Sequence, residues 1–489
     1  MKAYKTLIFI AVILFLLTMV CVFFPKNGVP FFGRQLFFPT LEEVFVREKS
    51  RSVSEKMKDL EASLQFKIIQ DSIHNAKVAA YNDSINFYKN FFNTHPARFY
   101  LPENEETFFD FLFTALENCE KDSTIIHILH YGDSQIEEDR ITGIFRQKMQ
   151  EKFGGIGAGL LPVVQPIPSA AIGQSASEGI ERFIIAGMHK NQAGHSRYGA
   201  LGQMAQVNNG VKIAFSARNY SRTFDNTKKW TQIRLFVSRN SQNFSATLSS
   251  NSLNGKKTIE QSKNYPTTLV WKCDTIMSKC ALSFNGTAEL TGVSLDGDFG
   301  VTVDNIPLRG SSGTFFTAID TTTFEPMLKE LNVKLIMLEF GGNMMPSISN
   351  QKHIDNYMEI MAKQIFHLQN IYPQAKIVLI GPADMSKTVR GKLQTYPLLV
   401  ELVEAMKNTA LQNNAAFWNM FDVMGGENSM LDWVKEKPSL AAPDYIHFTP
   451  KGADKIGEML FESLMNYYQY YKLRDKRRLD TGSQTQDTN

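Results

Sequence analysis

A serine, an aspartate and a histidine in this sequence have the types and the spacing that acyl transfer needs. Ser134 follows Gly132-Asp133, and Asp444 precedes His447 by three positions. A serine hydroxyl is a weak nucleophile until a base removes its proton, and an imidazole whose tautomer is fixed by a carboxylate is such a base. The spacing lets Asp444 reach Nδ1 of His447 while Nε2 faces Ser134. We therefore predict that these three residues form a catalytic triad.

The same chemistry needs hydrogen-bond donors for the oxyanion that develops when the hydroxyl attacks a carbonyl. Asn343 follows Gly341-Gly342, and its side-chain amide is one candidate donor. The backbone N–H of Ser134 is another. Taken singly, a serine after a strand is usually a helix cap, and an asparagine there is usually a turn residue. Found together, in this order on one α/β scaffold, these residues indicate an active site more specifically than any one of them alone.

The predicted elements place these residues at one edge of a parallel sheet. Nearly continuous apolar runs predict strands, and amphipathic runs predict helices between them. Buried strands that alternate with helices indicate a parallel sheet covered on both faces, and sites in such sheets gather at the carboxyl ends of the strands. We expect strands at 125–131, 333–340, 376–380 and 416–421, and helices at 137–153, 353–370, 397–413 and after Thr449-Pro450.

Residues 180–298 have a different pattern of predicted secondary structure. Strand-like runs follow one another with Asn-Gly turns and without a convincing helix, which is typical of an all-β module of about sandwich size. Because α/β character returns afterwards, we expect this module to be an insertion within one α/β domain. Its clearest strand-like runs are 182–186, 211–216, 231–237, 245–249, 267–271 and 281–284.

An uncharged apolar run, residues 6–24, lies near the N-terminus. As a helix it would span roughly 28 Å, close to the thickness of a bilayer core. A cleaved signal peptide would have a shorter apolar region followed by small residues, whereas this run ends in Val-Phe-Phe-Pro. Lys2 and Lys5 precede the run, which favours a cytoplasmic N-terminus. We therefore predict a single-pass membrane protein whose catalytic domain is periplasmic or otherwise extracytoplasmic.

The formal net charge of +3 is concentrated at the two ends of the chain. Lys2 and Lys5 supply +2 and residues 472–489 supply another +2, which leaves the remainder of the chain at −1. A neutral body argues against a nucleic-acid-binding surface. The sequence has neither a C-x-x-C pair nor a P-loop, and its other histidines lack metal-ligand spacing. We therefore predict no metal, no cofactor and no nucleic-acid partner.

Two cysteines lie close together in the predicted β module. Cys273 and Cys280 stand at opposite ends of Cys-Asp-Thr-Ile-Met-Ser-Lys-Cys, a run that suggests a hairpin. An extracytoplasmic compartment permits a disulfide between them. Two buried free thiols are an equally good interpretation, and the sequence leaves both open.

Several residues have simpler explanations than chemistry. His127 and His130, in the strand before Ser134, are expected to be hydrogen-bonded core histidines. The acidic run 137–139 is expected to form the first turn of the following helix, where it suits the helix dipole. Most aromatic residues of the β module are expected to pack in its core rather than stack on sugars. The candidates considered are Trp230, Trp271 and Tyr220.

The set Gly132-Asp133-Ser134, Gly341-Gly342-Asn343 and Asp444-Tyr445-Ile446-His447 resembles the motifs of the SGNH (GDSL-type) hydrolases. The resemblance covers about residues 120–172 and 300–470. It implies a flavodoxin-like three-layer α/β/α fold and esterase or acyltransferase activity. The family's second motif supplies a backbone glycine to the oxyanion hole. The run Asn305-Ile-Pro-Leu-Arg-Gly310 looks like this motif, which implies that role for Gly310.

A narrower resemblance is to the peptidoglycan O-acetylesterases and O-acetyltransferases. These carry a carbohydrate-binding-like β module between the first and second motifs, as the insertion ending near Gly300 does here. The resemblance implies an O-acetylated glycan as substrate. Two positions depart from the pattern. Met344 follows Asn343 where the family often has an acidic residue, and Gln135 stands where relatives often have histidine.

Apolar residues at helical spacing predict two further helices, at 41–75 and 105–119. The first of these would be a membrane-proximal stalk. The polar C-terminus is expected to be disordered. We therefore expect a transmembrane signal anchor (1–30), a helical stalk (31–104), a first hydrolase part (105–174), an inserted β-sandwich (175–299), a second hydrolase part (300–472) and a disordered tail (473–489).

Three functions are compatible with this organisation. The first is a membrane-anchored extracytoplasmic serine esterase that removes O-acetyl groups from a cell-wall or surface polysaccharide through an acyl-serine intermediate. The second is an O-acetyltransferase that moves acetyl onto a glycan hydroxyl and receives it from a membrane-bound donor protein. The third is a non-catalytic glycan-binding protein. The intact Ser134, Asp444 and His447 favour an enzyme, and we expect the esterase.

Overall fold

The computed structural model divides into two units, residues 1–56 and 57–489, which are described separately. In the first unit, helix α1 (Ala3–Phe23) precedes a small hairpin of β1 (Val29–Phe31) and β2 (Arg34–Leu36). Helix α3 (Val53–Leu64) spans the boundary. The described residues are 3–25, 29–31, 34–36, 38, 53–64, 78–219, 223–260 and 266–484.

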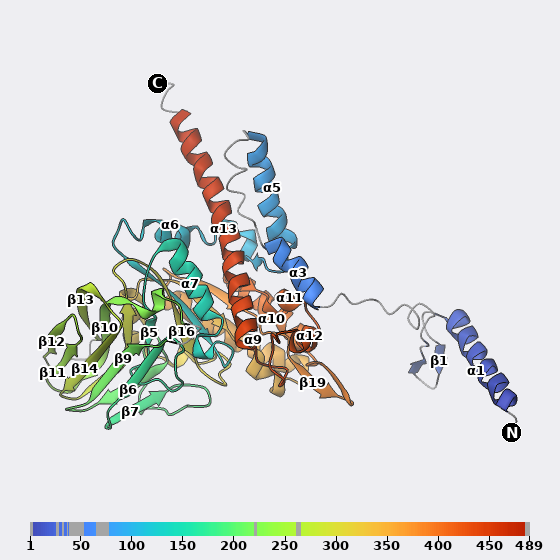
Figure 1. The fold of residues 1–489 in the computed structure, drawn as a ribbon, viewed down its shortest axis with the longest axis horizontal. Coiled ribbons are helices and arrows are strands. Elements are labelled where there is room, and N and C mark those ends of the chain that lie inside the picture. Colours follow the sequence, from blue (N-terminus) through green and yellow to red (C-terminus); the bar gives the residue numbers. More distant parts are fainter. Residues whose placement is uncertain are drawn as a thin grey trace. The chain divides into compact units, whose positions relative to one another are not determined.

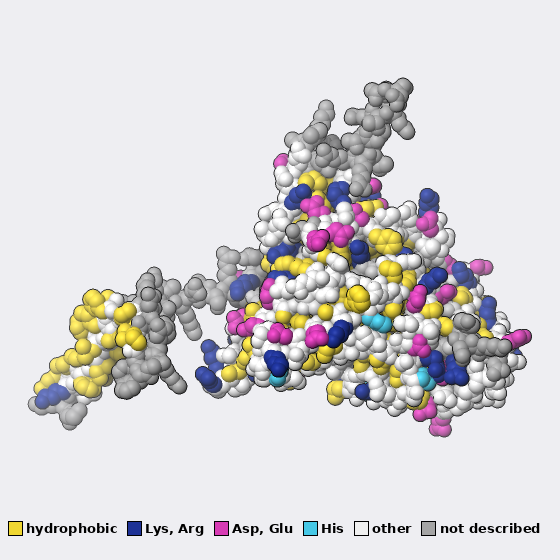
Figure 2. All heavy atoms as spheres, turned by 180° about the vertical axis from the view of Figure 1, so that it is seen from behind, with side chains coloured by type: hydrophobic (Ala, Val, Ile, Leu, Met, Phe, Trp, Pro, Cys, Tyr) yellow, Lys and Arg dark blue, Asp and Glu magenta, His cyan; other side chains and the backbone are white. Residues whose placement is uncertain are grey.

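Helix α1 carries no charged residue after Lys5. The segment Tyr4–Phe23 has a mean hydropathy of 3.0, and Figure 2 shows almost only hydrophobic side chains on it. A helix of this length and composition can cross a membrane, and a signal sequence near an N-terminus has the same properties.

The second unit is built on a six-stranded sheet in the order β16-β4-β17-β18-β21-β3, whose edge strand β16 is labelled in Figure 1. Five strands are parallel, and short β3 pairs antiparallel with β21 at one edge. Strand β4 is buried at every position because it has a strand on each side, which explains its continuous apolar run. The strands are β3 (Phe99–Tyr100), β4 (Ile125–Gly132), β16 (Gly300–Pro307), β17 (Val333–Glu339), β18 (Lys376–Ile380) and β21 (Ala416–Trp418).

Helices cover this sheet on both faces. Helices α8 (Thr321–Glu330), α9 (Gln351–Ile371) and α10 (Leu399–Gln412) share one apolar cluster with the strands. On the other face, α6 (Asp110–Asn118) contacts β17 and α7 (Thr142–Phe153) contacts β16. The long helix α13 (Pro450–Gln484) contacts both α6 and α7. The predicted mixed α/β class is therefore confirmed.

One predicted strand of the main sheet is shorter in the structure. We expected a strand over 416–421, but β21 ends at Trp418. Asn419 then caps helix α11 (Met420–Met424), because its side chain accepts a hydrogen bond from the N–H of Asp422. A further short helix, α12 (Ser429–Lys435), precedes the loop that leads to α13.

Residues 159–296 form two antiparallel sheets between α7 and β16. Their orders are β13-β10-β15-β8-β7, with β5 beside β15, and β12-β11-β14-β9-β6. Side chains from both sheets share one buried cluster, which includes Trp230 and Trp271 as expected; Tyr220 lies outside the described residues. The strands are β5 (Gly159–Leu161), β6 (Ile172–Ala176), β7 (Ile180–Ile184), β8 (Gln203–Val207), β9 (Lys212–Ala217), β10 (Trp230–Asn240), β11 (Phe244–Ser249), β12 (Asn254–Ile259), β13 (Thr267–Met277), β14 (Lys279–Asn285) and β15 (Ala288–Asp296).

The hairpin predicted around Cys273 and Cys280 is wrong. Strand β13 pairs with β10, whereas β14 pairs with β9 and β11, so Ser278 carries the chain from one sheet to the other. Both cysteines are free thiols. Cys280 is 5% exposed within the apolar cluster, and Cys273 Sγ lies 3.2 Å from Thr275 Oγ1. The disulfide that the sequence leaves open is not formed in the structure.

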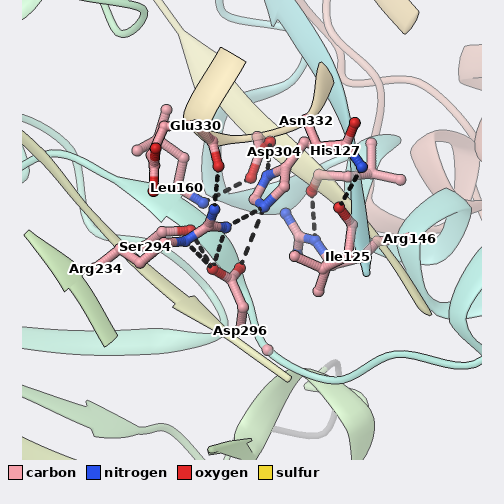
Figure 3. Close-up of polar contacts among 12 residues, drawn as sticks. Ile125, His127, Arg146, Leu160, Arg234, Ser294, Asp296, Asp304, Glu330 and Asn332 are labelled. Carbon is pink, nitrogen blue, oxygen red and sulfur yellow. Dashed lines mark hydrogen bonds and ion pairs between the residues drawn. The ribbon is translucent and has the colours of Figure 1, made fainter. Parts of the chain in front are cut away.

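A buried polar network joins the antiparallel sheet that contains β10 and β15 to the main sheet (Figure 3). Arg234 of β10 donates through Nη2 to Asp296 Oδ2 and to His127 Nε2 of β4, both at 2.6 Å. His127 Nδ1 lies 2.7 Å from Asp304 Oδ2 of β16. Because a guanidinium can only donate, the ring hydrogen of His127 sits on Nδ1 and points to Asp304. The prediction of a hydrogen-bonded core histidine is confirmed at His127, and at His130, whose Nε2 lies 3.0 Å from Glu339 Oε2.

The segment expected to be a stalk contributes to the main domain from residue 78 onward. Helix α5 (Val78–Thr94) contacts α13, and Phe92 stacks on Tyr467 with ring centroids 4.1 Å apart. Strand β3 then completes the sheet. Of the helix predicted at 41–75, the structure describes α3 alone.

The tail also differs from the prediction of disorder over 473–489. Helix α13 continues to Gln484, and Arg474 Nη1 donates to Asp110 Oδ2 at 3.0 Å. Residues 485–489 lie outside the described part of the chain.

The free thiols give a first prediction. In the native full chain, a thiol reagent should modify Cys273 and leave Cys280 unmodified, because burial raises the pKa of the Cys280 thiol to about 12 and keeps it protonated. Both should react after denaturation without reductant. Peptide mass mapping measures this, with Cys273→Ser as the control. A Cys273–Cys280 cross-linked peptide in the unreduced sample would contradict the structure.

The buried network gives a second prediction. Arg234→Met leaves Asp296 without its cation and His127 without its donor, so it should lower the free energy of unfolding by about 3–5 kcal/mol. Arg197 forms a partly exposed bidentate pair with Glu289 in the same sheets, and Arg197→Met should cost about 1 kcal/mol. Thermal unfolding followed by circular dichroism compares the two. Equal losses of unfolding free energy in the two variants would show that the buried network stabilises the protein no more than a partly exposed ion pair does.

Candidate active site

The three predicted triad residues lie in hydrogen-bonding order. Ser134 follows the carboxyl end of β4, and its Oγ lies 2.8 Å from His447 Nε2. His447 Nδ1 lies 2.7 Å from Asp444 Oδ2. A serine hydroxyl that bonds an imidazole, which in turn bonds a carboxylate, is the arrangement that activates a serine nucleophile.

The loop before α13 explains why a spacing of three brings Asp444 onto His447. Asp444 Oδ1 accepts hydrogen bonds from the backbone N–H groups of Ile446 (2.9 Å) and His447 (3.0 Å), which closes a tight turn. Tyr445 in this turn has a φ of +58°. Oδ2 is then left to meet the imidazole. Burial alone would raise the pKa of Asp444, but the hydrogen bonds from His447 and from the two N–H groups outweigh burial and lower it.

Gln135, the residue after Ser134, holds the loop that contains His447 through two side-chain hydrogen bonds. Its Nε2 donates to the carbonyl of Ile446 at 2.6 Å, and its Oε1 accepts from the N–H of Phe448 at 3.3 Å. Both bonds flank His447. The sequence marks Gln135 only as a departure from a resemblance, since nothing local shows that it reaches a loop more than 300 positions away.

Gly310 lies in a tight turn that follows β16. The N–H of Ser311 donates to the carbonyl of Leu308 at 2.9 Å, and Gly310 has a φ of +75°, which favours glycine. A Cβ at this position would lie 2.7 Å from Met188 Cγ. Within the described residues, the N–H groups of Gly310 and Ser134 donate to no protein atom. Both groups line the same cleft and are free to bind an oxyanion.

Asn343 reaches the cleft, but its amide is engaged there. Nδ2 donates to Asp133 Oδ2 at 2.7 Å and to the carbonyl of Ser311 at 3.2 Å. The amide thus ties the serine turn to the Gly310 turn. Its predicted role as an oxyanion donor stays a prediction.

Asp133 is a buried carboxyl beside the nucleophile. Its Oδ1 accepts from the N–H of Gln135 at 3.0 Å. Burial raises the pKa of Asp133 to about 7, and the nearby Glu339 adds to the rise, while the hydrogen bonds from Gln135 and Asn343 oppose it. Because this pKa is above the ordinary value of a carboxyl, ionisation of Asp133 opposes folding as the pH rises toward 7.

The acidic run 137–139 does not form the first turn of a helix, so that prediction is wrong. These residues form a separate 3₁₀ turn with a left-handed Glu138, and α7 begins at Thr142. Glu137 turns inward and pairs with Arg309, whose Nε lies 2.6 Å from Glu137 Oε1. Asp139 accepts from Arg146 at 3.1 Å. Tertiary ion pairs, which local periodicity does not reveal, override the helical pattern here.

The triad opens into a cleft of about 590 Å³. Ser134, His447, Gly310 and Asn343 line it together with apolar side chains from the loops after β17 and β18. Within the ranges that the structure describes, no group of three or more metal-ligating side chains occurs.

Comparisons with known proteins place the fold. No protein-family model matches the chain, and no curated protein matches it. A solved structure of a peptidoglycan O-acetylesterase aligns with a TM-score of 0.59 and 19% identity, covering 76% of this chain and 97% of that one. A family two carbohydrate esterase from Cellvibrio japonicus (TM-score 0.22, 10% identity, 62% and 99% covered) and a putative GDSL-like lipase from Parabacteroides merdae (0.27, 14%, 34% and 74%) superpose far less well. The chain therefore shares the fold of the peptidoglycan O-acetylesterase structure with which it aligns.

Proposed function

We propose that this protein is a serine esterase that removes O-acetyl groups from an extracytoplasmic polysaccharide. The observation that carries the proposal is the chain of hydrogen bonds from Ser134 through His447 to Asp444, at 2.8 and 2.7 Å, at the carboxyl edge of the main sheet. Serine, imidazole and carboxylate in this order perform acyl transfer on several unrelated folds.

In the proposed mechanism, Ser134 Oγ attacks the acetyl carbonyl while His447 Nε2 takes its proton. Asp444 holds the imidazole through Nδ1 and stabilises its charged form. The Gly310 and Ser134 N–H groups, with the Asn343 amide after it rotates, bind the oxyanion. His447 then protonates the departing sugar oxygen, which leaves as a hydroxyl, and an acetyl-serine remains. Water attacks this ester while His447 takes a proton from it, and His447 then gives that proton to Ser134 Oγ as acetate leaves.

The glycan part of the proposal has two supports. The sequence motifs resemble those of enzymes that act on O-acetylated glycans, and the well-superposed structure is named a peptidoglycan O-acetylesterase. We propose that residues 175–299, which hold most strands of the two antiparallel sheets, form a carbohydrate-binding-like module, and that the hydrolase domain comprises the segments before and after this module. We further propose that residues 6–24 anchor the chain with its N-terminus in the cytoplasm, since Lys2 and Lys5 precede the apolar run.

The third prediction concerns the nucleophile. Ser134→Ala in the full chain should lower acetate release from an aryl acetate and from an acetylated glycan by at least about 10³-fold, because only binding and the oxyanion donors remain. Ser252→Ala, an exposed serine outside the cleft, should match the wild type. Retained activity in Ser134→Ala would refute the proposal. Acetylated acceptor glycan in place of acetate would identify the protein as an acetyltransferase.

The fourth prediction concerns the oxyanion donor. Gly310→Ala should lower kcat by about 10²-fold, because a side chain at φ +75° is strained and would push against Met188, which displaces the N–H. Gly210 is the matched control, since it also has a positive φ, at +83°, but open space around its Cβ position. Gly210→Ala should keep the wild-type kcat. Equal kcat values for wild type and Gly310→Ala would exclude Gly310 from the oxyanion hole.

A further inference from the structure

An ion pair between a buried carboxylate, Glu137, and an exposed guanidinium, Arg309, lies at the wall of the cleft, and the mechanism does not use it. Glu137 is 1% exposed, and Arg309 grips its carboxylate with two nitrogens: Nε lies 2.6 Å from Oε1, and Nη2 bonds Oε2. Arg140 adds a donor from Nε to the Glu137 carbonyl at 3.0 Å. A carboxylate this buried is costly unless it is paired in this way.

The pair joins the two turns that carry the proposed reacting groups. Glu137 is three residues after Ser134, and Arg309 directly precedes Gly310. The Gly310 turn is also held through its backbone, since the N–H of Met188 donates to the Arg309 carbonyl at 2.7 Å. The Glu137 bond is what ties the Arg309 side chain to the segment that contains the nucleophile.

The segment that holds Glu137 is strained. Glu138, Asp139 and Ile141 have φ values of +57°, +58° and +59°, and left-handed residues other than glycine cost of the order of 1–3 kcal/mol each. Two ion pairs restrain this segment: Glu137 with Arg309 at its start, and Asp139 with Arg146 at 3.1 Å further along. Strain of this kind persists where the surrounding structure fixes the backbone.

We propose that Glu137 and Arg309 are positioning residues, which hold the Gly310 N–H toward the oxyanion of the reaction proposed above. The inference rests on that proposed function. Neither side chain touches the reacting atoms. Their effect reaches the acyl oxygen only through the orientation of the Gly310 turn relative to Ser134.

The pair Arg197–Glu289 is a matched comparison. It is also bidentate, with Nε–Oε2 and Nη2–Oε1 both at 2.8 Å, but it lies in the inserted sheets and does not line the cleft. If a fall in kcat reflects only a broken ion pair, it should be the same for a substitution at Glu137 and for one at Glu289. A loss that reflects a displaced oxyanion donor should occur at Glu137 alone.

The fifth prediction tests this with the full chain in detergent and an aryl acetate as substrate. Glu137→Gln should lower kcat by about 10–100-fold with little change in KM, since a small displacement of an oxyanion donor has effects of that size. Arg309→Gln should lose as much, and Arg309→Lys, which keeps the charge, should recover part of it. The double variant Glu137→Gln/Arg309→Gln should be no worse than either single one, because the residues act as a unit.

Glu289→Gln should keep the wild-type kcat. The inference is overturned if Glu137→Gln keeps the wild-type kcat, if KM rises while kcat is constant, or if Glu289→Gln loses as much as Glu137→Gln. Ser134→Ala is run beside these variants as the reference. If wild-type turnover does not depend on Ser134, the proposed function and this inference fail together. If it does, a negative result for Glu137 counts against the positioning role alone.

Discussion

The register of strand β4 against its two neighbours is the constraint on which the rest of the structure depends. Its last residue, Gly132, pairs with Pro307 of β16 and with Glu339 of β17. The loops with Ser134, Gly310 and Asn343 therefore leave the sheet at one level. A slip of one residue in either pairing would move a loop by about 3.3 Å, which is more than a hydrogen bond can tolerate. The distances among Ser134, Gly310 and Asn343 depend on these pairings.

The antiparallel sheet that contains β10 is joined to the main sheet by buried side chains. Arg234 of β10 donates a hydrogen bond to His127 of β4, and His127 donates one to Asp304 of β16 (Figure 3). Buried networks of this kind often contribute more to a single arrangement than to net stability. The insertion also reaches the cleft, because the N–H of Met188 bonds the Arg309 carbonyl. Removing the insertion would therefore alter both the core and the Gly310 turn.

The sequence predicted the parts whose causes are local or periodic. Apolar runs identified β17 and β18 within a residue, and Ser134 and Asn343 were predicted just after strand ends, where the structure has them. Asp444 and His447 instead lie in the loop between α12 and α13. It did not predict the inward turn of Glu137, because the partner Arg309 is 172 positions away. It also joined Cys273 and Cys280 in one hairpin, since a short link between sheets looks like a hairpin turn. Nor did it predict that α13 continues past residue 472.

In the proposed reaction, the acetyl group of the substrate is transferred to Ser134 before acetate is released. Rapid quenching of the full chain with an acetyl ester in acid, followed by peptide mass spectrometry, measures this directly. We predict one added acetyl group on the peptide that contains Ser134, and none when His447 is replaced by alanine, because the base is then absent. Acetate release with no acetyl on Ser134, or with the acetyl on another residue, would contradict the account.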